Sequence, residues 1–536
     1  MSRQTNKLVL AITLGMIFAF LLGGISFTLF PLQAFTKQQA LVEPFSPTSG
    51  ASTQPTSGYS VISNASSSNN QANSYGPAQF YFGYQLPGIT IEKDGSVNST
   101  TAPISRNGNT YTLTGDIVNQ TILVNRDNII INGAGHTLEG FYNGTNVFAA
   151  EAISLQNVQN VTIENFAFDS FLQPIQAQDA LNLQIEENNF TSCAPAPSVT
   201  IAFDSCNDSV IARNSLEGIV EIWNPLTHNV TMNNLSDGIQ VYQSSNITIT
   251  GNTLRNVCHS ILVEDSNSSI ISNNIMVNDT SGIYTDGSST VFGNSLYNVT
   301  DTGLWISEQD NVLVDGNSSI VSNNVIVNGG TGIDAGGNAI IFGNSIYNMT
   351  DAGVWISGQD NRIYGNTIEN TGCGVWLATG SYSEGSDYYY ITVLISGENN
   401  RIYGNTIENT GCGVWLGTGN FSDCVFYHNN FIHNTQDLEF NSTSTPVQWD
   451  NGNEGNYWSN YNGTSRNSDG IGDTPFNLGG NNTDFYPLMQ PYSAQSTITD
   501  HKTGRLFFIA ALIVAGIGVV VLLFLSFKRK FNGKRD

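Results

Sequence analysis

Short apolar stretches alternate with polar corners along most of the chain. From Ala152 to about Asn434, Ile, Val and Leu recur at alternate positions, and a small residue followed by apolar-x-apolar returns about every twenty residues. These small residues stand at positions 152, 174, 198, 218, 238, 260, 282, 303, 332, 353, 374 and 413. Alternation with a period of two predicts β-strands, and a repeat of this length predicts stacked coils. We therefore expect an all-β parallel solenoid of about twelve coils.

Two duplications reinforce this prediction. A segment that begins SSIISNN at Ser268 returns in altered form at Ser318, and NRIYGNTIENTGCGVWL stands unaltered at Asn361 and Asn400. Longer steps in the repeat mark insertions, one of them at about 379–396, and protruding loops often carry recognition.

Asparagine recurs at the corners, where it tolerates a left-handed backbone and can hydrogen-bond from coil to coil. The expected ladder comprises Asn252, Asn273, Asn294, Asn323, Asn344, Asn366, Asn405 and Asn429.

The flanks of the repeat differ from it in composition. An apolar stretch at 8–32 follows Arg3 and Lys7 and predicts a cleaved signal or an uncleaved anchor, between which the sequence does not decide. A second uncharged stretch, 506–527, precedes the basic tail KRKFNGKRD and predicts a transmembrane helix with a cytoplasmic tail. The expected divisions are 1–35 signal or anchor, 36–85 flexible spacer, 86–151 N-terminal β cap, 152–434 β-helix, 435–492 closing block, 506–527 membrane helix and 528–536 tail.

The motif NIIINGAGHTLEG at Asn128 and the closing motifs GNYWSNY, DGIGDTPF and DFYPLM carry a family resemblance. Residues 86 to 489 resemble the right-handed parallel β-helix proteins of the NosD and carbohydrate-binding or sugar-hydrolase type, which are pectin lyase-like in fold and common on archaeal surfaces. The resemblance implies the fold more strongly than an activity. Members range from accessory proteins linked to copper-enzyme maturation to sugar-active enzymes.

Charge narrows the choice of partners. The chain carries a net charge of −25, and residues 36–500 contain 42 Asp or Glu against 9 Lys or Arg. Phosphate binding requires clustered cations, so we do not expect a nucleic-acid partner. An acidic surface outside the cell is better suited to cations and neutral sugars.

The residue between the two inward apolar positions should point outward in every coil. At this position the chain places aromatic residues in Tyr284, Trp305, Trp355, Trp376 and Trp415. Such a strip predicts stacking of an extended sugar chain. The alternative is that the 379–396 insertion or the GNYWSNY block covers the strip as a second core.

Catalysis on a β-helix would require clustered carboxylates. The repeat aligns Asp301 with Asp351 and Asp310 with Asp360, and Arg362 and Arg401 stand nearby. These six residues are the suspects for a polysaccharide lyase or glycoside hydrolase. Duplication alone would also align them, and of the polygalacturonase-type motifs only NTD occurs, at Asn482. We therefore favour a non-catalytic, membrane-anchored extracellular protein that binds or organises surface polysaccharide or glycoprotein.

Metal ligands are sparse in the sequence. Copper would need grouped His, Met or Cys, but the nearest histidines, His428 and His433, suit exposed corners better. Calcium could bind Asn467, Asp469 and Asp473 in the segment SRNSDGIGD, for which the alternative is a loop of Asx turns.

Cys373 and Cys412 occupy the same repeat position. They can form a disulfide if their coils are neighbours, or remain as stacked buried thiols. N-x-S/T sequons such as Asn160, Asn246 and Asn298 are frequent, either by chance in an Asn-rich chain or as glycosylation sites.

Overall fold

The structure, a computed structural model, describes residues 86–141, 149–193, 199–218, 237–307, 318–378, 397–441 and 444–493. Among these residues no helix is long and apolar enough to cross a membrane. The predicted signal or anchor, spacer, 379–396 insertion, transmembrane helix and basic tail lie outside the described residues.

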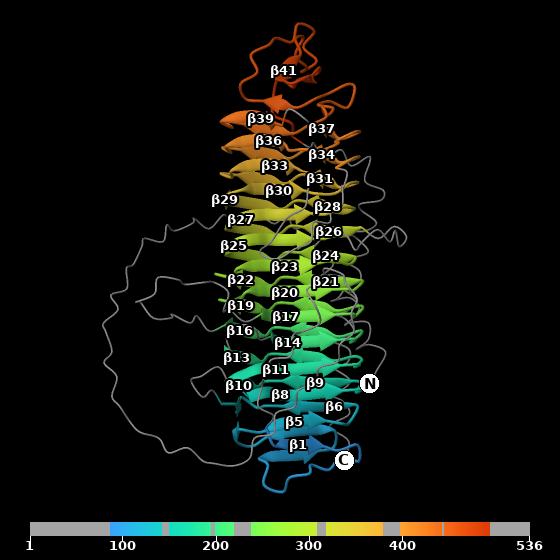
Figure 1. Cartoon of the computed structure of the whole chain (residues 1–536), viewed down its shortest axis with the longest axis vertical. Helices are drawn as coiled ribbons and strands as arrows, with labels where there is room; N and C mark the ends of the chain where they lie inside the picture. Colours follow the sequence, from blue (N-terminus) through green and yellow to red (C-terminus); the bar gives the residue numbers. More distant parts are fainter. Residues whose placement is uncertain are drawn as a thin grey trace, which may run out of the picture. The chain divides into compact units, whose positions relative to one another are not determined.

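The described residues form a parallel β-helix with three faces, and successive coils stack along one axis (Figure 1). The first face comprises β1 (Gly88–Ile91), β5 (Thr121–Val124), β8 (Ala149–Gln156), β11 (Phe171–Gln178), β14 (Val199–Asp204), β17 (Asp237–Tyr242), β20 (His259–Glu264), β23 (Ser281–Thr285), β25 (Ser295–Ile306), β27 (Val325–Ala335), β30 (Ala352–Ile356), β33 (Cys373–Leu377), β36 (Cys412–Leu416) and β39 (Gln436–Phe440).

The second face comprises β4 (Ile117–Val118), β7 (Thr137–Glu139), β10 (Ala167–Asp169), β13 (Asn189–Cys193), β16 (Ser215–Gly218), β19 (Thr253–Arg255), β22 (Ile275–Val277), the first halves of β25 and β27, β29 (Ser345–Met349), β32 (Thr367–Glu369), β35 (Thr406–Glu408), β38 (Asn430–Ile432) and β40 (Tyr457–Trp458). Because β25 and β27 continue from the second face into the first, these two faces form one 26-stranded sheet.

The third face is a 14-stranded sheet. It comprises β2 (Ile104–Asn107), β3 (Thr110–Leu113), β6 (Ile129–Asn132), β9 (Val161–Glu164), β12 (Gln184–Glu186), β15 (Val210–Ala212), β18 (Thr248–Thr250), β21 (Ser269–Ser272), β24 (Ser289–Phe292), β26 (Ser319–Ser322), β28 (Ala339–Phe342), β31 (Arg362–Tyr364), β34 (Arg401–Tyr403) and β37 (Val425–Tyr427). Only β2 pairs antiparallel here, in a hairpin with β3. A last hairpin, β41 (Phe476–Gly479) with β42 (Asn482–Asp484), follows the coils.

The predicted alternation of inward and outward residues is confirmed. Ile283, Val354 and Val375, which the pattern places inward, are buried in one continuous core. The small residue before each inward pair is explained by close approach between coils: a Cβ at Gly282 would lie 2.1 Å from the carbonyl oxygen of Gly303 in the next coil. The repeat motif therefore reflects backbone packing as well as burial.

The expected coil position at residue 218 is wrong. Gly218 belongs to β16 on the second face, and the first-face strand β14 pairs directly with β17, through Ile201 and Ile239. The step at 198 is also out of phase by two, because Ile201 rather than Val199 is the residue that aligns with the inward Ile175. Coils also begin earlier than the pattern indicates, since β1 and β5 already pair in parallel within the segment expected to form a cap.

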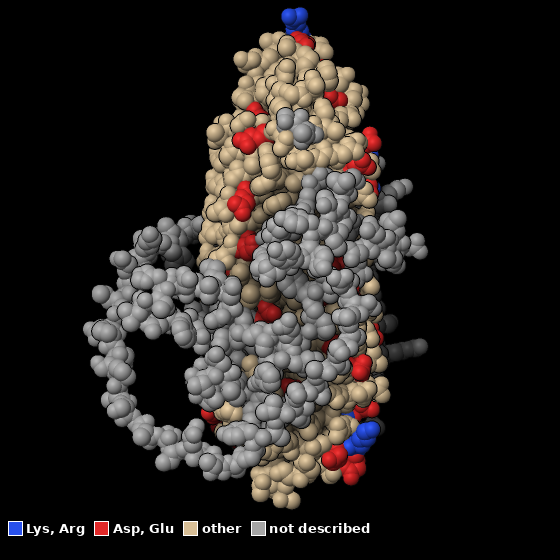
Figure 2. All heavy atoms as spheres, viewed as in Figure 1, with Lys and Arg blue, Asp and Glu red and all other residues tan. Residues whose placement is uncertain are grey.

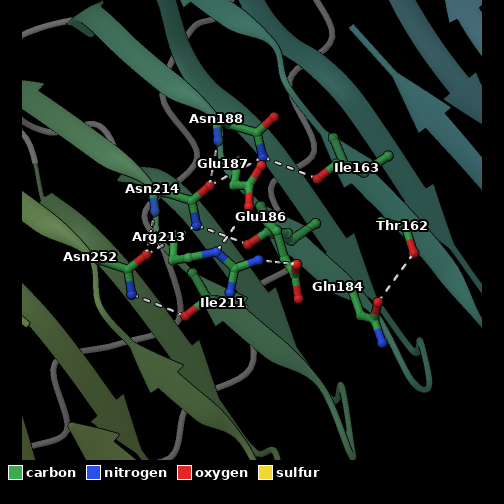
Figure 3. A network of polar contacts seen from close by, with 11 residues as sticks. Thr162, Ile163, Gln184, Glu186, Glu187, Asn188, Ile211, Arg213, Asn214 and Asn252 are labelled. Carbon is green, nitrogen blue, oxygen red and sulfur yellow. Dashed lines mark hydrogen bonds and ion pairs between the residues drawn. The ribbon is translucent and has the colours of Figure 1, made fainter. Parts of the chain in front are cut away.

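A buried ladder of asparagines joins the second and third faces (Figure 3). The side-chain Oδ1 of Asn252 accepts hydrogen bonds from the backbone N–H and the Nδ2 of Asn214, at 2.9 and 3.1 Å, while its own Nδ2 donates to the carbonyl of Ile211. The same pattern repeats along the stack. Its members are Asn188, Asn214, Asn252, Asn274, Asn294, Asn324, Asn344, Asn366, Asn405, Asn429 and Asn456.

The expected assignment of Asn273 and Asn323 to this ladder is wrong by one residue. Both precede a ladder asparagine and have a positive φ of 54°. At each of these corners one asparagine therefore adopts the left-handed backbone, and the next asparagine forms the hydrogen bonds between coils. Arg213 takes the left-handed position before Asn214, and its guanidinium forms ion pairs with Glu186 and Glu187 at 2.5 and 3.0 Å (Figure 3).

The closing block seals the C-terminal end of the stack. Trp458 from GNYWSNY is buried and stacks on Phe431 with ring centroids 4.2 Å apart. The Oδ2 of Asp484 accepts hydrogen bonds from the indole of Trp458 and from the backbone of Asn456, the last ladder asparagine. The NTD motif at Asn482 thus has a structural role here.

Cys373 and Cys412 pair in register on β33 and β36 and form a disulfide, with Cα atoms 4.5 Å apart. Of the two alternatives left open by the sequence, the structure contains the bonded one. The acidic balance of the chain is visible on its surface, where Asp and Glu outnumber Lys and Arg on the face shown in Figure 2.

Candidate functional site

One outward column on the first face contains the predicted aromatic residues. Register pairs join Tyr284 to Trp305, Trp305 to Asp334 and Asp334 to Trp355 in successive coils. Trp355 then pairs with Trp376, and Trp376 with Trp415. All six side chains are partly exposed, between inward residues that are buried. We call these six residues the aromatic column.

The rings of the aromatic column do not form the flat strip that alternation alone predicts. Trp355 and Trp376 stack face to face, with centroids 4.7 Å apart and planes at 2°, so they shield each other's faces and present their edges. Trp415 is turned by 82° relative to Trp376, and Tyr284 by 85° relative to Trp305. A ring face is therefore available to a ligand mainly where neighbouring rings are not stacked face to face, as at the pairs Tyr284–Trp305 and Trp376–Trp415.

Polar groups are built into the same column. Desolvation raises the pKa of Asp334 to about 7, the hydrogen bond donated by Ser357 works against this rise, and the charge of Asp301 adds to it. Ser357 Oγ lies 3.3 Å from Asp334 Oδ1. The indole nitrogen of Trp376 is buried, and among the described residues it has no hydrogen-bond partner. The column therefore combines tryptophan rings with a carboxyl group that changes charge near neutral pH.

Asp334 occupies the same outward position as these aromatic residues, but the sequence analysis did not count it among the catalytic suspects. Its neighbours in the register are Trp305 and Trp355, and this combination of an acid between two aromatic residues is the signal that points to it. Carboxyls with raised pKa values in partly enclosed positions are more frequent at functional sites than elsewhere.

The five catalytic suspects that the structure describes are not brought together. Asp301 and Asp351 are separated by one coil, in which Gly330 takes the equivalent place, since Thr302 pairs with Thr331 and the Asp351 amide donates to Gly330. The repeat therefore aligns these two residues in one column, but not in adjacent coils, because the fifty-residue duplication spans two coils. Asp310 lies outside the described residues.

The arginine suspects lie on the third face. Arg362 and Arg401 pair in register on β31 and β34, exposed and side by side, and Asp360 is an exposed corner residue just before β31. Beside them runs a second aromatic stack, Phe342, Tyr364, Tyr403 and Tyr427, with neighbouring centroids 5.0 to 5.2 Å apart. These groups belong to a different sheet from Asp301 and Asp351.

The predicted calcium ligands share one exposed loop, but their oxygens already have protein partners. Asp469 accepts hydrogen bonds from Ser465, Asn467 and the Ile471 backbone. Asp473 accepts one from the Arg466 backbone at 3.0 Å. This arrangement has the hydrogen bonds of an Asx-turn loop, and calcium binding stays a prediction.

Two histidines, His428 and His259, contact other ionisable side chains, which the sequence analysis did not predict. His428 has the positive φ of a corner residue, at 59°, but its side chain is not exposed as expected, because it lies 2.6 Å from Glu454 and stacks on Tyr492. Elsewhere, Asp237, Cys258 and His259 place one ligand atom each within 4.8 Å of one another. The signal for this cluster was present in the repeat, because Asp237 and His259 both precede the small residue of their coils, at positions 238 and 260.

Comparisons with known proteins agree with the fold. A family model described as periplasmic copper-binding protein (NosD) matches residues 218–372. A model described as right-handed beta helix region matches residues 129–274 and 312–447, which together span more than half of the chain. No curated protein matches the sequence.

Solved structures with a similar fold include three sugar-related proteins. The periplasmic alginate epimerase AlgG is 12% identical, with 68% of this chain and 84% of that chain covered and a TM-score of 0.39. An alginate lyase, AlyF-OU02 in complex with G6, is 13% identical, with 62% and 79% covered and a TM-score of 0.40. The tailspike of E. coli bacteriophage HK620 in complex with pentasaccharide is 12% identical, with 64% and 72% covered and a TM-score of 0.38.

At these identities and TM-scores, the similarity to these structures carries no argument about this chain. The family matches carry more weight, because they cover the coils and agree with the observed parallel register. The chain therefore belongs to the right-handed β-helix family, and its residues 218–372 are similar to NosD.

Proposed function

We propose that the protein binds an extended polysaccharide along the aromatic column, without cleaving it. The observation that carries this proposal is the in-register run of Tyr284, Trp305, Asp334, Trp355, Trp376 and Trp415, partly exposed on one flat face. Successive coils rise by about 4.8 Å, so six of them offer a surface longer than 20 Å, which fits a chain better than a small molecule.

The ring geometry indicates how a glycan would be held. Ring faces turned outward can stack on a sugar ring, while the stacked pair Trp355 and Trp376 offers ring edges. Asp334 would add a hydrogen-bond donor when protonated and an acceptor when ionised. A neutral polysaccharide, or the glycan of a surface glycoprotein, suits the acidic surface because it brings no anionic charge of its own.

Asp334 also supports a second candidate, a glycoside hydrolase or polysaccharide lyase. An acid whose pKa is raised to about 7 can donate a proton to a leaving group at neutral pH. Asp301, whose charge influences Asp334, is a candidate for a second carboxylate. The non-catalytic proposal is preferred because the described suspects do not gather around one point.

A glycan array with the full chain, read beside reducing-end and unsaturated-product release, separates the two candidates. For binding, we expect Trp355→Ala and Trp376→Ala each to weaken affinity by about tenfold, as loss of an aromatic contact worth about 1 to 1.5 kcal/mol implies. Tyr364→Ala and Tyr403→Ala on the third face are matched controls and should leave affinity unchanged.

For catalysis, Asp334→Asn is the decisive variant. If the protein is an enzyme, this change abolishes product release while binding persists. If it is a binding protein, wild type and variant both lack turnover. Equal loss of binding in the first-face and third-face variants would contradict the assignment of the aromatic column.

We also propose that the β-helix is held outside a membrane by the flanking apolar segments. The disulfide between Cys373 and Cys412 supports an oxidising environment. Protease added to intact cells should then remove the β-helix and leave an epitope placed after Arg535 intact. Digestion of that epitope would contradict the orientation.

A further inference from the structure

The geometry points to a binding site for a zinc-type transition cation formed by Asp237, Cys258 and His259. This inference is independent of the proposed glycan binding. The site lies at the corner where the second face turns into the first, at the starts of β17 and β20. Asp237 and His259 occupy neighbouring coils, and Cys258 directly precedes His259.

The three donor atoms are close enough to share one ion. His259 Nδ1 lies 2.8 Å from Asp237 Oδ1, and all three ligand atoms lie within 4.8 Å of one another. Ligands around a tetrahedral zinc ion, bound at about 2.0 to 2.3 Å, are themselves roughly 3.5 Å apart. Small side-chain rotations would therefore bring the thiol into position without moving the backbone.

The chemistry of the donors selects the class of cation. A thiolate, an imidazole and a carboxylate form a borderline-soft set that suits zinc and its neighbours. Calcium and magnesium prefer oxygen ligands only. Three protein ligands leave a fourth position for water or for a further donor.

Cys258 differs from the other free cysteines whose side chains the structure describes. Cys206 and Cys424 are buried, whereas Cys258 is partly exposed beside a histidine. In a chain that also contains a disulfide, an exposed thiol would be open to oxidation unless a partner protects it. Bound metal would provide that protection.

The surroundings favour a cation. The strand that begins with His259 ends with Glu264, and Asp265 and Asp286 add negative charge close to Glu264. No arginine or lysine forms an ion pair with Asp237 among the described residues, where its charged partner is His259.

The test uses the full chain, freed of metal with a chelator and kept reduced at Cys258. Cobalt, which replaces zinc and absorbs visible light, should bind one ion per chain with tetrahedral d–d bands and a thiolate charge-transfer band. Zinc should displace it, and a large excess of calcium or magnesium should not. A cobalt spectrum without the thiolate band would overturn the proposal.

Variants assign the ligands. Cys258→Ser should abolish the charge-transfer band, and Asp237→Asn and His259→Gln should each weaken cobalt binding by at least about tenfold. His136→Gln is the matched control, because His136 pairs with Asp116 at 3.3 Å in the same way but its pair is not part of the cluster with a thiol. Binding that is unchanged in all three ligand variants would also overturn the proposal.

A second measurement does not depend on any variant. Alkylation of Cys258 in the wild-type chain, followed by peptide mass analysis, should slow at least about tenfold when zinc occupies the thiolate. Alkylation at the same rate with and without zinc would show that the thiol is not a ligand.

Discussion

In the buried ladder defined above, the side-chain oxygen and nitrogen of each asparagine have hydrogen-bond partners, whereas the buried Nδ2 of Asn361, outside this ladder, has none among the described residues. Asn324 accepts two hydrogen bonds from Asn294 and donates to Asn344 and to the carbonyl of Val291, all near 3.0 Å. Neither an apolar residue nor an acid can make this set of contacts. The exposed corner residues beside the ladder must instead adopt a left-handed backbone. Two asparagines that are neighbours in the sequence are therefore required for different reasons, one for its backbone conformation and one for its side-chain hydrogen bonds.

Replacing one ladder residue should be costly. Asn324→Ala leaves the backbone N–H of Asn294 and other buried groups without partners, and each unsatisfied group costs about 1 to 3 kcal/mol. We expect the free energy of unfolding in urea to fall by about 3 kcal/mol or more. Thr290→Ala, at an outward position of β24, should change it by less than about 0.5 kcal/mol.

Buried carboxyls should make stability rise on mild acidification. Desolvation raises the pKa of Asp279 from 3.8 to about 7, although Ser260 and Val257 donate hydrogen bonds to it. The folded state therefore holds its proton more tightly than the unfolded chain. Its contribution to stability is complete below about pH 4 and is lost as the pH rises towards 7.

Asp279→Asn tests this sign. The variant keeps the size of the side chain but cannot titrate. Between about pH 4 and pH 7 its free energy of unfolding should therefore fall by less than that of the wild type, the difference being on the order of 2 to 4 kcal/mol. Asp208→Asn, at an exposed corner, should retain the wild-type profile. A wild-type Asp279 contribution that increased with pH would contradict the argument.

At the scale of the strands, the pattern predicted what depends on local alternation. It identified the parallel coils, the inward residues and the positions of the aromatic column, because these follow from a period of two and a regular step. It failed at residue 218, because Gly218 ends β16 on the second face and does not precede a first-face strand between β14 and β17. It aligned Asp301 with Asp351 but did not show that one coil separates them, because a repeat of fifty residues covers two coils.

The candidate site was less predictable than the fold. Outward positions can be assigned from alternation, but the angles between rings, the raised pKa of Asp334 and the meeting of Cys258 with Asp237 depend on contacts between coils. These contacts join residues about twenty positions apart, and small changes in corner length alter them.

The disulfide should strengthen the link between β33 and β36. It closes a loop over a sequence separation of 39 residues, for which chain entropy predicts about 4 kcal/mol. We expect the double variant Cys373→Ala, Cys412→Ala to melt at a lower temperature than the oxidised wild type, and reductant to lower the wild-type value only. Equal melting of both proteins under oxidising conditions would contradict this expectation.

For the whole molecule, the ends of the stack need the most protection, since an open coil exposes unpaired strand edges and core side chains. At the N-terminal end, the β2–β3 hairpin contributes Tyr111, whose hydroxyl donates to the Gly95 carbonyl at 2.8 Å. At the other end, Trp458 and Asp484 close the last coil.

Weakening the C-terminal closure should expose that edge. Asp484→Asn replaces an acceptor of several buried donors with a group that must turn its own N–H₂ towards one of them, so we expect a loss of about 2 kcal/mol. Increased self-association, measured by light scattering, should accompany it. Asp473→Asn in the neighbouring exposed loop should change neither quantity.

The two identical segments at Asn361 and Asn400 allow an incorrect register during folding. If the second copy packed directly on β30 in place of the first, it would make the same side-chain contacts there, so these contacts alone would not disfavour the loss of one coil. Only the cysteines differ between the two outcomes, because Cys373 and Cys412 can join only when both copies are stacked in order. Formation of the disulfide therefore distinguishes a chain in which both copies occupy successive coils from a chain in which one copy has been skipped.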